Sequence, residues 1–317
     1  MKDMVSRSHR RRADQIFYVL AFLVLLLVAR GVIAPQSLAP TNLLETLRQA
    51  APLGLVAIGQ TIALLVGGID LSVTAVITLT NVIAAKMMIE GDRTIPATLV
   101  VVILVALLIG SVNGSLIVFF RLPPIITTLA ASIVVQGIYY IYTRGAPIGK
   151  IASGFRVVAD GHLGAIPWAA LIWLLAIAVM WVVLRRTSYG VQLYATGGNP
   201  QASRLSGIAN RMVTVSAYML SSLFACFAGL MLSAYIGVAS TSVGDGYDLS
   251  SIAATVIGGT AFTGGEGGIL GTVVGVLVLT VLNGLLTIIN ISDAGKLIVQ
   301  GTIIILMMAA QVSSKKG

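Results

Sequence analysis

The sequence has few charged residues, one cysteine and two histidines. Only 10% of its 317 residues are charged and 57% are hydrophobic, whereas soluble domains carry about 25% charged residues. With Cys226 as the single cysteine, a disulfide framework or a cysteine metal site within the chain is excluded. His9 and His162 have no neighbouring ligand residues, so we expect both to be solvated. This composition favours a multi-span membrane protein over a metalloenzyme.

Motifs of nucleotide-hydrolysing and common hydrolytic enzymes are also missing. Gly149-Lys150 and Gly295-Lys296 lack both the earlier glycine and the following Ser or Thr of a phosphate-binding loop. The patterns H-E-x-x-H and G-x-S-x-G do not occur. We therefore expect no catalytic residue, no metal site and no cofactor bound by this chain. A membrane enzyme would need a nucleophile or an acid–base pair within the bilayer, and none is evident.

Apolar runs near the ~20 residues that cross a bilayer recur along the whole chain. They predict an all-α, polytopic bundle of about ten spans, with eight to eleven as the range, and a single transmembrane domain over residues 1–317. The eighth run is short and glycine-flanked, so we expect a bent or partial helix there. We expect the first run to be a retained helix and not a signal peptide. The predicted spans are 16–34, 50–67, 71–89, 96–119, 124–143, 166–184, 212–235, 250–263, 268–290 and 295–312.

The distribution of basic residues predicts the orientation of these spans. With both termini in the cytoplasm, the basic arm 1–15 and the central loop 185–212 lie inside, as the positive-inside rule requires. Twelve of the 20 basic residues then fall on the cytoplasmic side: Lys2, Arg7, Arg10, Arg11, Arg12, Arg121, Arg185, Arg186, Arg204, Arg211, Lys315 and Lys316. We expect a multi-pass membrane protein surrounded by lipid, with no nucleic-acid partner.

A glycine pair followed by an acid separates the second and third runs. Gly67 and Gly68 leave helical geometry at low cost, and Asp70 or Ser72 is placed to cap the next helix by accepting its backbone N–H groups. A direct role of Asp70 in substrate passage is the alternative to this capping role.

Three runs carry polar residues at helical spacing on one face. Hydroxyl and amide groups of this kind suit a hydrated route for a neutral solute with many hydroxyls. Alternatively, each is a hydrogen bond between helices, worth about 0.6 kcal/mol on average in membranes. The candidate pathway residues are Asp70, Thr74, Thr78, Asn81, Asn113, Thr128, Ser132, Gln136, Tyr140 and Asn283.

The central polar segment, 184–213, contains signals for a short helix. Asn199 is a plausible cap, Pro200 suits the first helical position, and Gly207 suits a stop. This predicts one to two helical turns that display Gln201 and Arg204. Because few apolar residues are available to bury in lipid, we expect a groove in another protein to receive this helix.

The chain resembles the inner-membrane permeases of bacterial ABC sugar importers of the ribose, xylose, arabinose and galactose type. The resemblance covers nearly the whole length in six ordered blocks: GGIDLSV (67–73), GSVNGSLIV (110–118), LPPIITTL (122–129), RGAPI (144–148), YGVQLYATGGNPQASRLSGI (189–208) and YDLSSIAATVIGGTAFTGGEGG (247–268). Two departures are small: Thr74 stands where the family usually has Gly, and Tyr189-Gly190 where Gly-Arg is common.

The resemblance implies partners and a role for the central helix. It implies a second permease copy, as a homodimer or a heterodimer, two cytoplasmic ATPase subunits that hold ATP and Mg²⁺, and a periplasmic sugar-binding protein. It further implies an importer subunit that moves a monosaccharide or related polyol by alternating access, and leaves the sugar open. A self-contained secondary carrier is the alternative function. The residues implied to couple to the ATPase are Gly198, Asn199, Pro200, Gln201, Ala202, Ser203, Arg204, Leu205, Ser206 and Gly207.

Overall fold

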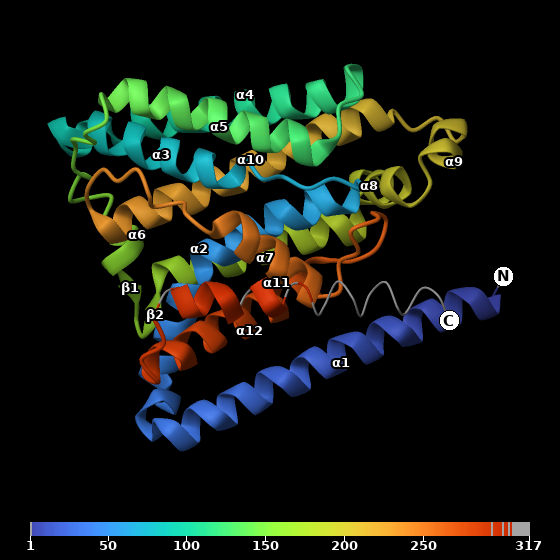
Figure 1. The fold of residues 1–317 in the computed structure, drawn as a ribbon, viewed down its shortest axis with the longest axis horizontal. Coiled ribbons are helices and arrows are strands. Elements are labelled where there is room, and N and C mark those ends of the chain that lie inside the picture. The colour runs from blue at the N-terminus through green and yellow to red at the C-terminus, as the bar shows by residue number, and fades with distance from the viewer. Residues whose placement is uncertain (1, 293, 300, 304, 306–317) are drawn as a thin grey trace.

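The chain folds into an elongated helical bundle built around two helices. The computed structural model describes residues 2–292, 294–299, 301–303 and 305. Helices α2 (Pro40–Leu65) and α10 (Asn210–Ile236) pack against each other in the interior, and both are long enough to run the length of the bundle (Figure 1). Residues 50–65 of α2 are buried throughout.

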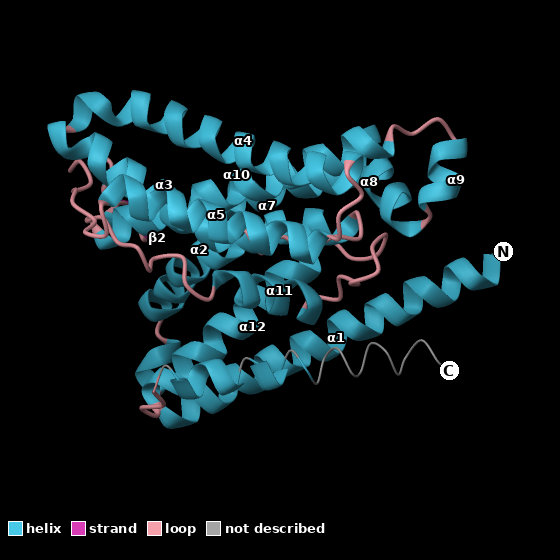
Figure 2. Ribbon diagram, turned by 45° about the horizontal axis from the view of Figure 1, so that its top comes forward, coloured by secondary structure: helices cyan, strands magenta, loops and turns pink. Residues whose placement is uncertain are grey.

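The other long helices surround this pair. α4 packs on α10 and α3, α5 packs on α3, and α1 packs on α12. Their bounds are α1 (Lys2–Ile33), α3 (Val73–Met87), α4 (Ile95–Phe119), α5 (Pro124–Thr143), α7 (Trp168–Arg186) and α12 (Ile269–Ile288). Figure 2 shows that helices account for most of the described chain, with loops between them.

Short elements join the long helices, and most of them lie at the ends of the bundle (Figure 1). They are 3₁₀ turns η1 (Pro35–Leu38), η2 (Met88–Glu90) and η3 (Asp92–Thr94), helices α6 (Val157–Asp160), α8 (Ser188–Gly198), α9 (Pro200–Leu205) and α11 (Tyr247–Ile257), and strands β1 (His162–Leu163) and β2 (Ile166–Pro167). Helix α11 instead packs within the bundle, on α2 and α12. The strands pair antiparallel, with His162 opposite Pro167. Gly164, at a φ of 63°, makes the tight turn between them. This hairpin was not predicted from the sequence.

Two ends of the bundle can therefore be distinguished. We call the end that carries α8 and α9 the α9 end, and the end that carries α6, β1 and β2 the hairpin end. The N-terminal start of α1 lies toward the α9 end (Figures 1 and 2).

Six described helical segments are long and apolar enough to cross a membrane. They are Val73–Glu90, Asp92–Phe119, Pro124–Thr143, Trp168–Arg186, Asn210–Ile236 and Ile269–Ile288, with Phe17–Ile33 and Tyr247–Ile257 as shorter apolar helices. The prediction of a multi-span helical protein is confirmed, whereas the number of ten and the side of the termini stay predictions. The predicted tenth span, 295–312, lies partly outside the described residues. Lys315 and Lys316 lie wholly outside them.

The predicted eighth span is a short helix. α11 has 11 residues and ends at Ile257, where Gly258 follows and the chain continues without helix to Gly268. An 11-residue helix is about 16 Å long, half of a bilayer core. This agrees with the expectation of a partial helix over 250–263.

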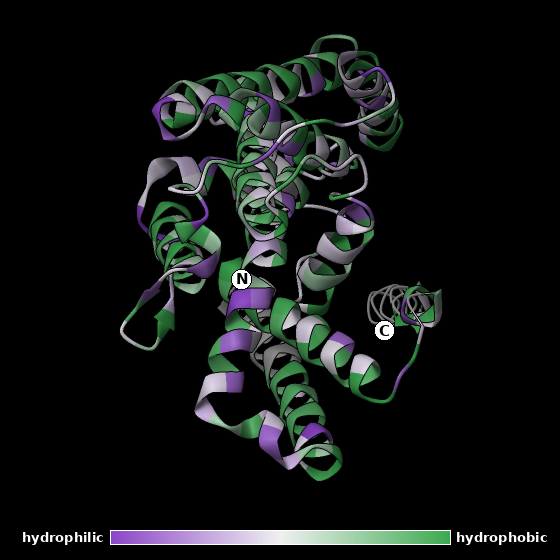
Figure 3. Ribbon diagram, turned by 90° about the vertical axis from the view of Figure 1, so that its left-hand side faces the viewer, coloured by the Kyte–Doolittle hydropathy of each residue, from purple (hydrophilic) through white to green (hydrophobic). Residues whose placement is uncertain are grey.

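Glycines allow α4 to approach α10 closely. A side chain at Gly114 would lie 2.6 Å from the Val215 Cα, and one at Gly110 would lie 2.7 Å from the Met219 Cα. Small residues at a helix contact bring two backbones together, which increases dispersion contacts where lipid removes the hydrophobic drive for association. The outward side of α4 is apolar instead, with Leu104 and Leu108 about three-fifths exposed. Hydrophobic residues cover most of the helical ribbon in Figure 3, as expected for a lipid-facing bundle.

Candidate functional site

The short helix α9 forms as its sequence predicts. The Asn199 side-chain oxygen accepts hydrogen bonds from the backbone N–H groups of Gln201 (3.1 Å) and Ala202 (3.0 Å), so it caps the helix. Pro200 occupies the first position, and Gly207 follows the helix at a φ of 82°. Gln201 and Arg204 are exposed, as predicted. Leu205 is 90% exposed, so the helix presents an apolar side chain with no cover inside this chain.

One asparagine, which the sequence did not single out, ties α8, α9 and α10 together. The Asn210 amide donates to the Pro200 carbonyl (2.8 Å), and its oxygen accepts from Ser203 (2.7 Å) and Thr196 (3.3 Å). Within the predicted coupling segment 198–207, all of which the structure describes, Ser203 is the one buried residue. The α9 helix is therefore held to the body of the protein by a defined set of hydrogen bonds.

Arginines line a hollow beside α9. Arg121, Arg204 and Arg211 contribute to the wall of a cavity of about 280 Å³, together with Asn210. The guanidinium group of Arg211 also lies 5.9 Å from the centre of the Phe119 ring. Three cations around one hollow give this surface a positive potential, which favours an acidic partner surface.

The helix that precedes α9 was not predicted. α8 covers Ser188–Gly198 and begins at Thr187, whose side-chain oxygen accepts from the Gly190 N–H (3.4 Å). The Tyr194 hydroxyl donates to the Gly267 carbonyl (3.0 Å) in the segment before α12. α8 therefore connects the exposed α9 to the interior.

Backbones meet directly where α8 reaches the interior. The Gly265 N–H donates to the Leu65 carbonyl at the end of α2 (2.9 Å). A side chain at Gly197 would overlap the Leu65 carbonyl oxygen and lie 2.7 Å from the Gly265 nitrogen. A side chain at Gly264 would lie 2.9 Å from the Gly67 Cα and 3.0 Å from the Gly197 Cα. We call this contact among residues 65–67, 197 and 264–265 the glycine junction.

The glycine junction adjoins the break between α2 and α3. Residues 66–72 leave the helical path, with Gly67 at a φ of 81°. The side-chain amide of Gln60 replaces helical hydrogen bonds in this segment. With the amide oriented to satisfy both contacts, its nitrogen donates to the Asp70 carbonyl (3.0 Å) and its oxygen accepts from the Asp70 N–H (3.3 Å). Non-helical backbone at membrane depth requires such partners. Gln60 is a second functional candidate that sequence reasoning missed.

Asp70 lies in a buried polar cluster. Its carboxylate accepts from the Ser72 hydroxyl (2.6 Å) and from the Ser72 N–H (3.0 Å). The Asn113 amide donates to the Ser72 hydroxyl (2.9 Å), and the Leu71 N–H donates to the Thr128 hydroxyl (3.1 Å). The predicted capping is therefore wrong in detail. The Ser72 side chain accepts no hydrogen bond from the backbone of α3, and the Asp70 carboxylate accepts from Ser72 and not from the N–H groups in the first turn of α3.

The predicted stripe on α3 binds a loop of the same chain. The Asn81 amide donates to the Val238 carbonyl (3.2 Å) and accepts from the Ser240 N–H (2.7 Å). Thr78 accepts from the Gly244 N–H (3.2 Å), and Thr74 accepts from the Asp248 N–H (3.3 Å). These three residues therefore hold residues 237–248 in place. This is the structural role, hydrogen bonding between elements, that the sequence offered as the alternative to a solute pathway.

The remaining pathway candidates are more open. On α5, Ser132 is half-buried, whereas Gln136 and Tyr140 are exposed. On α12, Asn283 is half-buried and lines a cavity. Thr128, by contrast, is fully buried against the α2–α3 break. The structure therefore does not bring the ten candidates into one surface.

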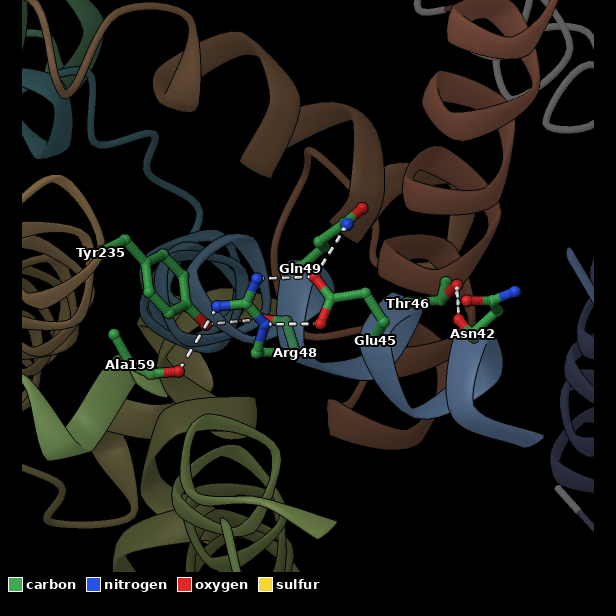
Figure 4. Close-up of polar contacts among 7 residues, drawn as sticks. All are labelled: Asn42, Glu45, Thr46, Arg48, Gln49, Ala159 and Tyr235. Carbon is green, nitrogen blue, oxygen red and sulfur yellow. Dashed lines mark hydrogen bonds and ion pairs between the residues drawn. The ribbon is translucent and has the colours of Figure 1, made fainter. Parts of the chain in front are cut away.

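A polar cluster holds the N-terminal part of α2 at the hairpin end (Figure 4). Arg48 makes a bidentate ion pair with Glu45, with N–O distances of 2.6 and 2.7 Å, and donates to the Ala159 carbonyl of α6 (3.4 Å). The hydrogen bond from Arg48 holds the pKa of the Glu45 carboxyl below its usual value. The Tyr235 hydroxyl donates to the Arg48 carbonyl (2.8 Å), and the Gln49 amide donates to Glu45 (3.1 Å).

Comparisons with known proteins agree with this architecture. The family model described as "Branched-chain amino acid transport system / permease component" matches residues 42–308. The chain is similar to the ribose import permease protein RbsC of Bacillus subtilis, at 38% identity over 93% of this chain and 91% of the relative. It is also similar to the galactose/methyl galactoside import permease protein MglC of Escherichia coli K12, at 34% identity over 93% and 92%.

The RbsC protein of Haemophilus influenzae is a further relative, at 33% identity over 91% of this chain and 90% of the relative. No solved structure matches the chain. The resemblance to sugar import permeases that the sequence blocks indicate is therefore confirmed over almost the full length. The chain belongs to the family of permease components described as those of branched-chain amino acid transport systems.

Proposed function

We propose that this protein is the membrane-spanning translocation subunit of an ATP-driven importer for a monosaccharide or a related polyol. The observation that carries the proposal is the similarity to ribose and galactose import permeases over more than nine-tenths of the chain. The chain contributes no ATPase site of its own, and partner subunits hold the ATP and Mg²⁺. The protein resides in the bacterial inner membrane, with about ten spans and both termini in the cytoplasm.

The α9 segment, Gly198–Gly207, is proposed as the surface that receives movement from the ATPase. A coupling element must be exposed to its partner and rigid toward its own domain. Leu205 and Arg204 supply the exposed surface, and the Asn210 hydrogen bonds supply the rigidity. The arginine-lined hollow beside α9 favours an ATPase groove with acidic residues at its rim.

The α9 end is then cytoplasmic and the hairpin end periplasmic. A periplasmic binding protein delivers the sugar at the hairpin end, and a second permease copy, identical or homologous, completes the pore. Movement of α9 reaches the α2–α3 break through the glycine junction, since α8 touches Leu65 and Gly265 by backbone. The glycine junction then has two alternative packing arrangements, one for the outward-open and one for the inward-open state of the pore, and it switches between them without a gradual deformation.

Of the ten pathway candidates, we propose Gln136, Tyr140 and Asn283 as the ones that meet the solute. Gln136 and Tyr140 are exposed on α5, and Asn283 is half-buried at the wall of a cavity; an exposed amide in a span is costly in lipid unless water or protein meets it. Asp70, Asn113 and Thr128 instead support the α2–α3 break, because their hydrogen bonds are made to it.

The test is uptake of labelled D-ribose or D-galactose into proteoliposomes that contain the permease, its ATPase and its binding protein. We expect uptake that requires both ATP and the ATPase subunit. Uptake by the permease alone down a gradient contradicts the proposal and favours a secondary carrier. L-Leucine is tested in parallel because the family description names amino acids; uptake of leucine in place of sugar contradicts the proposed substrate class.

A further inference from the structure

A cavity lined by both polar and apolar side chains opens between α2, α11 and α12. Its volume is about 460 Å³, within the ~300–1,000 Å³ range of small-molecule sites. Polar side chains from separate parts of the chain converge on it: Gln49 of α2, Asp245 before α11, Ser250 of α11, and Thr280, Asn283 and Thr287 of α12. In a membrane protein, such a cavity is a place where a polar solute can replace its water shell.

The cavity lies toward the hairpin end. Gln49 donates to Glu45, and the Glu45 ion-pair partner Arg48 reaches Ala159 of α6. Figure 4 shows Gln49 directed away from Arg48, toward the neighbouring helices. On α12, the first cavity residue, Thr280, follows the Gly268 cap by 12 residues, about 18 Å of helix. The cavity is thus separated from the glycine junction by most of α12.

The cavity wall offers hydrogen-bond acceptors. The Thr280 hydroxyl donates to the Val276 carbonyl (2.9 Å), and the Thr287 hydroxyl donates to the Asn283 carbonyl (2.8 Å). The Gln49 amide nitrogen donates to Glu45 (3.1 Å). These donors are engaged within the protein, and the Thr hydroxyl oxygens and the Gln49 amide oxygen keep lone pairs that can accept hydrogen bonds.

The charge of the wall is balanced. Asp245 is its acidic residue and Lys296 its basic residue, so the lining residues carry no net charge at pH 7. A wall that combines oxygen acceptors with apolar side chains such as Leu53 and Leu297, and that carries no net charge, suits a neutral solute with many O–H donors and apolar C–H faces. An anion or a cation finds no excess of opposite charge there.

We propose that this cavity is a weak binding site for one neutral polyhydroxy solute, on the route from the binding protein into the pore. The inference rests on the proposed function and adds a substrate site within the permease itself. The occupant is a monosaccharide or a similar polyol. The site is weak because a transport site must release its solute, and because several of its polar groups already have partners in the protein.

Gly284 offers a way to fill the cavity without breaking the fold. It lines the wall near the C-terminal end of α12, and a Cβ atom added there would first meet the Arg30 guanidinium at 3.8 Å, an ordinary contact. Gly284→Phe adds a bulky ring to a residue of the cavity wall. Leu270→Phe is the matched control, because Leu270 lies on the same helix and is half exposed away from the cavity.

The experiment is substrate protection of an introduced cysteine in the complete importer complex in lipid nanodiscs. Thr287→Cys is made in a Cys226→Ala background and labelled with a membrane-impermeant maleimide, with and without D-ribose or D-galactose. For a Kd of about 1 mM, ~10 mM sugar leaves about a tenth of the sites free, so labelling slows about tenfold. Ser242→Cys, exposed on a nearby loop and outside the cavity wall, should label at an unchanged rate.

Gly284→Phe should abolish protection of Thr287→Cys, whereas Leu270→Phe should retain it. The proposal is overturned if sugar gives no protection at ~100 mM, if protection survives Gly284→Phe, or if L-leucine protects and sugar does not. It is also overturned if labelling is blocked in nanodiscs without sugar and restored in detergent, which indicates a lipid occupant. Labelling requires no ATP hydrolysis, so its result is independent of the uptake assay that tests the proposed function.

Discussion

The glycine junction makes a sharp prediction for two adjacent residues. Gly197→Ala places a methyl group onto the Leu65 carbonyl oxygen and 2.7 Å from the Gly265 nitrogen. Overpacking of this kind costs about 1–3 kcal/mol. Separation of the Gly265 N–H from the Leu65 carbonyl, now 2.9 Å apart, costs about 1 kcal/mol more. We expect Gly197→Ala to destabilise the protein by about 2–4 kcal/mol.

Gly198→Ala is the matched control. Its methyl group would lie 3.8 Å from the Gly265 Cα, an ordinary contact, and alanine is otherwise preferred to glycine in a helix. We expect no destabilisation from this change. At about 2–4 °C per kcal/mol for large domains, the difference between the two variants corresponds to roughly 4–16 °C in Tm.

The assay is thermal unfolding of the purified permease in nanodiscs, followed by tryptophan fluorescence, with ATP-driven uptake measured on the same preparations. Gly197→Ala should lower both Tm and the sugar transported per ATP hydrolysed. Equal effects of the two alanines, or an unchanged Gly197→Ala variant, would refute the close backbone contact and with it the transmission of movement through this junction.

Three further results are expected. Asn210→Leu removes the bonds to Ser203 and Pro200, so ATP hydrolysis measured alongside sugar uptake should become uncoupled; a coupled variant speaks against a rigid α9. Asn81→Leu removes the hydrogen bonds to the Val238 carbonyl and the Ser240 N–H. Because both residues are only partly buried or exposed, each lost bond costs about 1 kcal/mol, the net value of a typical hydrogen bond; faster proteolysis of the 237–246 loop measures this, and unchanged cleavage counts against it. For Glu45, the lowered pKa means that the ion pair stabilises above the ordinary carboxyl pKa and is lost as pH falls through the lowered value. The Tm advantage over Glu45→Gln, worth at most ~1 kcal/mol at this partly exposed site, should vanish on acidification; an advantage that grows instead contradicts the assignment.

Local signals made α9 predictable, whereas α8 depended on packing that the sequence does not display. The Asn199 cap, Pro200 and Gly207 act within a few residues, so their effect can be read directly. In α8, Gly190 suggests an interruption, yet it serves close approach: a side chain there would lie 2.7 Å from the Leu184 Cα. A glycine that breaks a helix and one that lets backbones touch look the same in sequence.

The polar stripes show a similar limit. Spacing correctly placed Thr74, Thr78 and Asn81 on one face of α3, but it could not tell what that face meets. Their partners lie in residues 238–248, more than 150 positions along the chain. Gln60 and Asn210 bind backbone only ten positions away, at Asp70 and Pro200, yet their roles were missed because no helix or turn signal in the sequence marks such a contact. Helical periodicity predicts faces; the contacts across them come from tertiary structure.

The most direct test of the account is a cross-link from α9 in the assembled complex. Leu205→Cys, at a position 90% exposed, is prepared in a Cys226→Ala background and treated with a short bis-maleimide, with Ser242→Cys as the control at an exposed loop. We predict that Leu205→Cys links to the ATPase subunit and that the yield changes on addition of ATP, while Ser242→Cys gives no such product. A link to the ATPase from Ser242→Cys and none from Leu205→Cys would contradict the assignment of α9 as the coupling surface.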